Sequence, residues 1–99
     1  MRRVEWSNAF KADYQREKNG LHKETLGAKL GAVGTLLQNH EPLPAANCDH
    51  PLAGQWKGRR DCHVCPDLVL IYSKPKDAKG NDLGVVRFER LGSHSELGL

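Results

Sequence analysis

The chain has 99 residues, of which 38% are hydrophobic and 27% charged, a balance typical of one soluble globular domain over residues 1–99. Its 15 Lys and Arg against 12 Asp and Glu give a net charge of +3, which favours an anionic partner without identifying one. No apolar stretch approaches the roughly 18 residues needed to cross a bilayer, and no apolar signal core follows Met1. We therefore expect a cytoplasmic protein with no membrane contact, and we exclude the disordered and fibrous classes.

The first half of the chain predicts a short strand followed by two helices. Residues 2–6 alternate enough for a strand, and Ser7 offers a hydroxyl that can cap the helix that follows it. Asn19-Gly20 ends that helix. A second helix is predicted over residues 23–39, because four apolar residues recur at helical spacing: Leu26, Leu30, Val33 and Leu37.

The second half changes to the period of strands. Residues 41–54 contain three prolines and predict a loop. A tight hairpin is predicted from residues 55–64 and 68–72, and residues 85–91 supply another strand before a short tail. We therefore predict an α+β domain of order β-α-α-β-β-β. Its two N-terminal helices pack on a four-stranded, mainly antiparallel sheet.

Three histidines are candidates for proton transfer. His50, His63 and His94 come from the loop, the hairpin and the tail, and strand pairing can gather them at one end of the sheet. Two histidines beside a phosphodiester can take the proton of a 2′-hydroxyl and return one to the leaving 5′-oxygen. Arg87 and Arg90 are candidate cations for the charged transition state, and strand alternation predicts that they lie on opposite faces. The competing interpretation is that each histidine is an ordinary structural residue.

A basic segment lies next to these candidates. Lys57, Arg59 and Arg60, with Trp56 beside them, predict a phosphate-binding patch with a ring for base stacking. The alternative is the ordinary solvated face of a half-buried strand.

The three cysteines, Cys48, Cys62 and Cys65, are an odd number, which argues for reduced thiols rather than a disulfide framework. Cys62-His63-Val64-Cys65 can form half of a zinc site, with Cys48 and His50 as the other half. A structural zinc site normally shows two knuckles with that spacing, and the chain has only one. We therefore predict no metal and no cofactor.

Ordered segments of the second half form a specific set: Asp49-His50-Pro51-Leu52, Gly54-Gln55-Trp56-Lys57-Gly58, Arg60-Asp61-Cys62-His63-Val64, Pro66-Asp67, Leu70-Ile71-Tyr72, Arg87-Phe88-Glu89-Arg90 and Gly92-Ser93-His94. In this order they resemble the YafQ family of type II toxins, within the RelE/ParE superfamily. Residues 1–40 are similar to that family only in their helical organisation.

The resemblance implies a RelE-like (microbial-RNase-like) fold and a metal-independent mRNA interferase, an endoribonuclease that cuts mRNA in the A site of the 30S ribosomal subunit. It also implies a cognate antitoxin, DinJ-like with a ribbon-helix-helix part, in a heterotetramer with the toxin. Carried over position by position, the catalytic residues of the family fall on His50, His63, Asp67, Arg90 and His94. RNA or ribosome contacts are expected from Trp56, Lys57, Arg59, Arg60 and Arg87.

Our hypothesis gives each catalytic residue a role. His94 and Asp67 form the proton-transfer pair, His50 and His63 orient the phosphate and the 2′-hydroxyl, and Arg90 stabilises the transition state. Swapped acid and base roles stay open.

The chain departs from the family at two places. The family has an aromatic residue four positions after the tail histidine, where this chain has Gly98, so base stacking is expected to be weaker. The loop over residues 73–83 is longer, and its lysines either contact ribosomal RNA or are simply solvated. Two other functions compete: a ParE-like gyrase inhibitor that cuts no nucleic acid, and a small zinc-binding adaptor.

Overall fold

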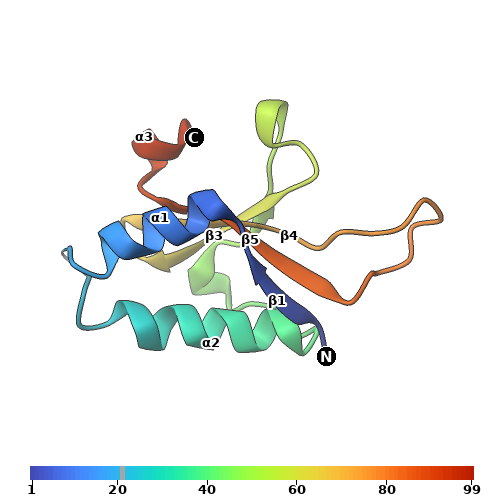
Figure 1. The fold of residues 1–99 in the computed structure, drawn as a ribbon, viewed down its shortest axis with the longest axis horizontal. Helices are drawn as coiled ribbons and strands as arrows, with labels where there is room; N and C mark the ends of the chain where they lie inside the picture. The colour runs from blue at the N-terminus through green and yellow to red at the C-terminus, as the bar shows by residue number, and fades with distance from the viewer. Residues whose placement is uncertain (21) are drawn as a thin grey trace.

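The computed structural model describes residues 1–20 and 22–99, and it forms a mixed sheet with helices on one face (Figure 1). The sheet has five strands in the order β1-β5-β4-β3-β2. Their bounds are Arg3–Trp6 for β1, His50–Pro51 for β2, Arg60–Cys65 for β3, Leu68–Ser73 for β4 and Val85–Gly92 for β5. Among the described residues no helix is long and apolar enough to span a membrane.

The two predicted helices are confirmed as α1 (Asn8–Glu17) and α2 (Leu26–Gln38). Ser7 caps α1, because its Oγ accepts a hydrogen bond from the amide of Phe10 at 2.9 Å. The same hydroxyl donates to the carbonyl of Glu89 at 2.7 Å, which fixes the start of the helix to β5. All four apolar stripe residues of α2 are buried: Leu26, Leu30, Val33 and Leu37.

The sheet contains the four predicted strands and one more. The edge strand β1 pairs in parallel with β5, and the other pairs are antiparallel. The extra strand is β2, a two-residue strand at the opposite edge, in which Pro51 is tolerated because an edge needs fewer ladder hydrogen bonds. The strand predicted from residue 55 begins only at Arg60, since Gly54–Trp56 form a short 3-10 helix, η2.

The core lies on both faces of β4. On the helix side, Leu70 and Tyr72 pack with Phe10 and Phe88. On the other face a smaller cluster joins Val69, Ile71 and Leu97, with Leu52 and Trp56 packed against it.

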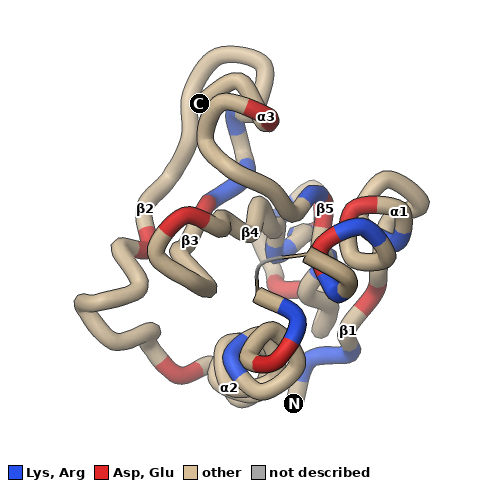
Figure 2. The backbone as a smooth tube through the Cα atoms, turned by 90° about the vertical axis from the view of Figure 1, so that its left-hand side faces the viewer, with Lys and Arg blue, Asp and Glu red and all other residues tan. Residues whose placement is uncertain are grey.

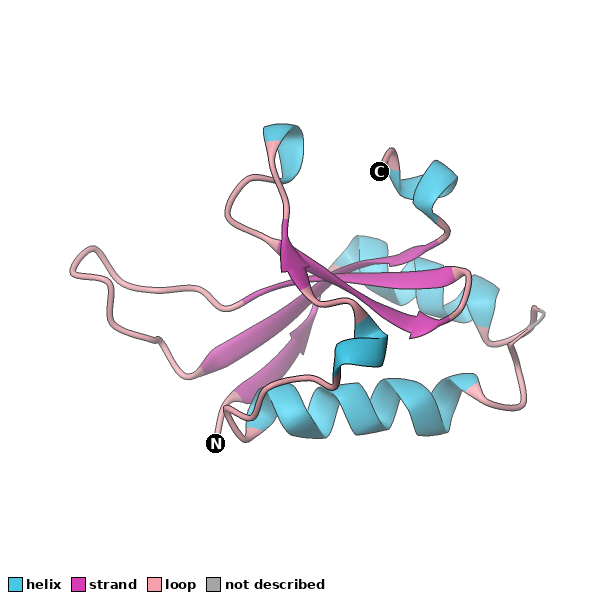
Figure 3. Cartoon of the chain, turned by 180° about the vertical axis from the view of Figure 1, so that it is seen from behind, coloured by secondary structure: helices cyan, strands magenta, loops and turns pink. Residues whose placement is uncertain are grey.

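Leu97 comes from a short helix, α3 (His94–Leu97), which the sequence did not predict. A capping box between Ser93 and Glu96 starts this helix. Figure 3 shows η2 and α3 rising from the sheet on the side opposite α2. The face of the sheet that they flank is referred to below as the open face.

A β-bulge in β5 overturns one expectation. Ile71 pairs with Arg90 and Tyr72 pairs with Phe88, so Glu89 is an extra residue in its strand. Arg87 pairs with Ser73, two residues along β4 from Ile71. The prediction that Arg87 and Arg90 lie on opposite faces is therefore wrong, because the bulge resets the alternation between them.

The Asp13 carboxylate of α1 holds the end of β5. It is buried, accepts hydrogen bonds from Arg90 Nε at 2.7 Å and from the amide of Leu91 at 3.0 Å, and pairs with Arg16 at 3.2 Å. Burial alone would raise the pKa of Asp13, but the hydrogen bonds and the charges of Arg90 and Arg16 outweigh it and lower that pKa. In Figure 2, acidic and basic segments lie close together where α1 meets β5.

Asp13→Asn is expected to lower the free energy of unfolding by about 2 kcal/mol at pH 7, since it removes the charge from a buried pair. The folded-state pKa of Asp13 lies below its unfolded value, so this stability is present above about pH 4 and is lost as pH falls through the folded pKa. Urea unfolding at pH 7 and pH 3 measures this, with the exposed Glu24→Gln as the control. An equal difference in the free energy of unfolding between wild type and Asp13→Asn at both pH values would contradict this pH dependence.

Candidate active site

Strand register brings most of the predicted catalytic residues into or next to two neighbouring rows on the open face. In the first row, His50 of β2 pairs with Asp61 of β3, Asp61 with Ile71 of β4, and Ile71 with Arg90 of β5. In the second row, two residues along each strand, His63 pairs with Val69 and Val69 with Gly92. His94 follows Gly92 by two residues and starts α3 above this row.

A buried carboxylate lies beneath the histidines. Asp61 is only 1% exposed, and its Oδ1 lies 3.0 Å from His50 Nδ1. That nitrogen is also 2.8 Å from the carbonyl oxygen of Cys48. Because both neighbours are acceptors, Nδ1 carries the proton, and a neutral His50 presents a bare Nε2. His50 is half exposed, so this nitrogen can reach a bound substrate.

The contact between Asp61 and His50 is an ion-pair contact and not a hydrogen bond, and Asp61 Oδ1 has no hydrogen-bond donor among the described residues. Burial raises the pKa of Asp61, while the charges of His50, His94 and His63 act in the opposite direction. The carboxylate of Asp61 thus lies within the electrostatic reach of all three histidines.

Asp61 was not among the site residues predicted from the sequence. The signal was available: Asp61 lies two residues before His63 in a strand, so alternation puts both side chains on one face.

His63 and His94 lie next to each other. Their rings are 5.1 Å apart between centroids, at an interplanar angle of 65°. The register of β3 with β4 and of β4 with β5 sets His63 beneath the start of α3. The structure thus brings His50, His63 and His94 to one end of the open face, which confirms that strand pairing gathers them.

A hollow of 660 Å³ lies against this group. Its lining includes His50, Asp61 and His94 together with Trp56, Leu52 and Gly98. Gly98 ends α3 with a φ of +71°, a conformation that favours glycine. The hollow therefore offers titratable groups next to an apolar wall.

Two predicted catalytic residues make no hydrogen bond or ion pair with these histidines within the described residues. Asp67 is exposed in the turn between β3 and β4, and no hydrogen bond or ion pair connects it to a histidine within residues 1–20 and 22–99. Arg90 begins on the open face, but its guanidinium is bound to Asp13 at 2.7 and 3.2 Å.

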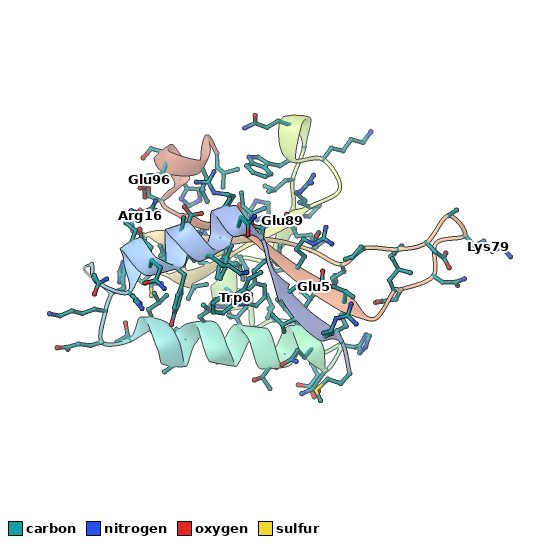
Figure 4. All side chains as sticks on the ribbon, viewed as in Figure 1. Glu5, Trp6, Arg16, Lys79, Glu89 and Glu96 are labelled. Atoms are coloured by element: carbon teal, nitrogen blue, oxygen red, sulfur yellow. The ribbon has the colours of Figure 1, made fainter. Side chains whose placement is uncertain are left out.

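The basic residues near the site are mostly paired. Arg60 binds Asp49 at 3.2 Å, and Arg87 binds Glu5 at 3.2 Å. Arg59 lies 3.4 Å from Glu89 and 5.9 Å from the Trp56 ring centre. Figure 4 shows the Glu89 side chain between the sheet and the η2 loop. Trp56 is partly buried, and its indole N–H donates to the carbonyl of Leu97 at 3.3 Å.

The cysteines are arranged differently from a zinc site. Cys62 and Cys65 are buried in the helix-side core, whereas Cys48 is exposed. Burial raises the pKa of Cys62 to about 12, which disfavours the thiolate that binds zinc. No group of three or more potential metal ligands forms within the part of the chain that the structure describes.

Comparisons with known proteins agree with this arrangement. A family model described as bacterial toxin of type II toxin-antitoxin system, YafQ, matches residues 2–98. The mRNA interferase toxin YafQ of Escherichia coli is 43% identical over 97 residues, which cover 97% of this chain and 95% of that protein. The crystal structure of Escherichia coli YafQ matches with a TM-score of 0.77 at 39% identity, over 98% of both chains. YafQ in the Escherichia coli DinJ-YafQ toxin-antitoxin complex matches with a TM-score of 0.74 at 40% identity, over 97% of this chain and 96% of that one.

Two helices on one face of a mixed sheet, with histidines and a carboxylate on the other, define a small α+β protein that carries acid–base groups on an open sheet face. The chain belongs to the YafQ family of bacterial toxins of type II toxin–antitoxin systems. The resemblance and the fold expected from it are therefore confirmed.

Asp61→Asn is expected to stabilise the protein at pH 7 by about 1 kcal/mol, because it removes a buried charge that lacks a donor. For a domain of this size, that raises the unfolding midpoint by about 4–8 °C. Because the folded-state pKa of Asp61 is raised, its destabilising effect grows as pH rises from the unfolded value through the folded one. The rise in the thermal unfolding midpoint of Asp61→Asn over wild type should therefore be larger at pH 7 than at pH 4.

The exposed Asp67→Asn is the matched control, and its stability should stay within about 0.5 kcal/mol of wild type. A lower midpoint for Asp61→Asn at pH 7 would show instead that the carboxylate stabilises the fold.

Proposed function

We propose that the protein is a ribosome-dependent endoribonuclease, an mRNA interferase that cuts mRNA in the ribosomal A site. The observation that carries this proposal is the gathering of His50, His63 and His94 around the buried Asp61, next to a hollow that His50, Asp61 and His94 line. The 43% identity to a protein named mRNA interferase toxin YafQ supports the same substrate class.

The reaction needs only proton transfers and charge stabilisation. A base takes the proton of the 2′-hydroxyl, the 2′-oxygen bonds to phosphorus, and the bond from phosphorus to the 5′-oxygen breaks. The leaving 5′-oxygen takes a proton from an acid, and the upstream fragment ends in a 2′,3′-cyclic phosphate. Three histidines within one small area suit this scheme, since imidazole changes charge near neutral pH.

In the proposed site, His94 and Asp67 form the proton-transfer pair, while His50 and His63 orient the phosphate and the 2′-hydroxyl. The bare Nε2 of neutral His50 suits an acceptor of the 2′-hydroxyl. His63 lies beside His94 and suits a group that holds the phosphate. Asp61 is a positioning residue in this proposal, because its carboxylate lies 3.0 Å from His50 Nδ1 and is almost fully buried.

The proposed partner is a cognate antitoxin, DinJ-like and of the ribbon-helix-helix type, bound in a heterotetramer. Its support is the similarity to YafQ chains solved in complex with DinJ, at 40% and 39% identity.

His94→Ala is expected to lower codon-phased mRNA cleavage by a factor of about 100 to 10,000, the range for loss of one acid or base. Primer extension on a reporter mRNA in a purified translation system measures this, with His22→Ala outside the site as the matched control. Replacing His50, His63 and His94 together by alanine should abolish the cuts while antitoxin binding is retained. Intact message with the wild-type toxin would overturn the nuclease and favour a ParE-like gyrase inhibitor.

Cleavage is proposed to proceed without a metal ion at the scissile phosphate. A message with sulfur in place of one non-bridging oxygen at the cut site tests this, since Mn²⁺ binds sulfur more readily than Mg²⁺ does. Adding Mn²⁺ to the Mg²⁺ that ribosomes require should leave cleavage of the sulfur-containing message unchanged. Faster cleavage of that message alone would place a metal ion at the phosphate.

A further inference from the structure

A second hollow adjoins the first one, with which it shares Leu52. It has a volume of 310 Å³, and its lining includes four cationic side chains together with Ser73 and Gly58: Arg59, Arg60, Lys74 and Lys76. We call this hollow the cationic groove. Its walls come from β2, from the segment that leads into β3, and from the start of the loop between β4 and β5.

The charge of the groove is only partly balanced. Arg60 is paired with Asp49, and Arg59 lies near Glu89. Neither Lys74 nor Lys76 forms an ion pair with any carboxylate of the described residues, so the two lysines leave an excess of about two positive charges. Burial, followed by the charges of Arg2 and Arg60, lowers the pKa of Lys74. Crowded cations of this kind bind an anion readily, because it relieves their repulsion.

Arg59 has further binding capacity. Its Nε is buried and makes no hydrogen bond within the described chain. Nε faces Glu89, and no described residue accepts a hydrogen bond from the terminal nitrogens of this guanidinium, so these nitrogens are the donors left for a phosphate oxygen, a ligand whose geometry the guanidinium matches.

The groove is continuous with the histidine site. Leu52 lines both hollows, and Arg59 lies over the ring of Trp56, which lines the first one. Along β4 the side chains of Ile71 and Ser73 are on the same face, and Ser73 lines the groove. Two residues of a strand span about 6–7 Å, a distance comparable with one nucleotide of an extended strand.

The loop between β4 and β5 holds the two lysines in place. Lys76 forms a β-bridge with Asp82, and Asp82 is bound by the buried Arg2 at 2.7 Å. The loop extends away from the sheet in Figure 1, and Figure 4 shows Lys79 at its far tip. Lys74 and Lys76 thus belong to the anchored base of the loop, whereas Lys79 does not line the groove.

We infer that the cationic groove binds a backbone phosphate of the single-stranded RNA substrate, next to the phosphate that is cut. Lys74 and Lys76 supply the charge, and Arg59 supplies a planar donor. This inference rests on the proposed ribonuclease function and adds a substrate subsite to it. In this proposal the groove holds the RNA strand in position, and the histidines carry out the proton transfers of cleavage.

The test uses an RNA that cannot be cut. A labelled single-stranded oligonucleotide with 2′-O-methyl groups lacks the attacking hydroxyl, so its binding is measured independently of cleavage. We expect the double variant Lys74→Gln and Lys76→Gln to bind it about tenfold more weakly in fluorescence anisotropy. The slope of log affinity against log salt should fall by about 0.7 for each phosphate that the variant no longer neutralises.

A matched control removes the same charge elsewhere. The double variant Lys11→Gln and Lys79→Gln loses two exposed lysines outside the groove and should bind within about twofold of wild type. Equal weakening by both double variants would overturn the subsite, because only net charge would then matter.

Two further results separate the groove from the nuclease. Unchanged oligonucleotide binding by Lys74→Gln and Lys76→Gln, with weaker binding to ribosomes, would overturn the inference and assign the groove to ribosomal RNA. Groove-dependent binding of the oligonucleotide, with no cutting of messages by the wild type, would support the subsite and reject the proposed catalysis.

Discussion

The pairing of β4 with β3 and β5 determines which residues meet on the open face. β4 is buried on both sides, so its register cannot slip by one residue without moving Val69 and Ile71 out of one core and Leu70 out of the other. That register sets Asp61 opposite Ile71 and His63 opposite Val69. The site is therefore a consequence of the packing of one apolar strand, and its histidines come from three segments that are distant in sequence.

This arrangement has an energetic cost in Asp61. A carboxylate that is 1% exposed and whose Oδ1 lacks a hydrogen-bond donor destabilises the folded state, yet in the proposed site it positions His50. The fold compensates elsewhere: Asp13 is also buried but is fully engaged by Arg90, Arg16 and the amide of Leu91. The two buried aspartates therefore differ in role. Asp13 stabilises the fold at the end of β5, whereas Asp61 lies against His50 in the candidate site.

The elements with a strong local pattern could be predicted from the sequence. The apolar stripe of α2, the Ser7 cap and the apolar run of β4 each follow from local periodicity or capping. Features that depend on pairing between distant residues could not. The two-residue β2 has no period to detect, the bulge at Glu89 is visible only against β4, and α3 is a single turn stabilised by its capping box and by Leu97.

The candidate site was predictable in its residue types and only partly in its geometry. His50, His63 and His94 converge as expected, whereas Arg90 is turned to Asp13. A guanidinium already paired with a carboxylate has little net charge to offer a transition state, since the two charges nearly cancel at a distance. The cationic side chains closest to the hollow are then those of the cationic groove, which shares Leu52 with it. In the proposed mechanism the histidines transfer protons, while cations from outside their row stabilise the developing negative charge.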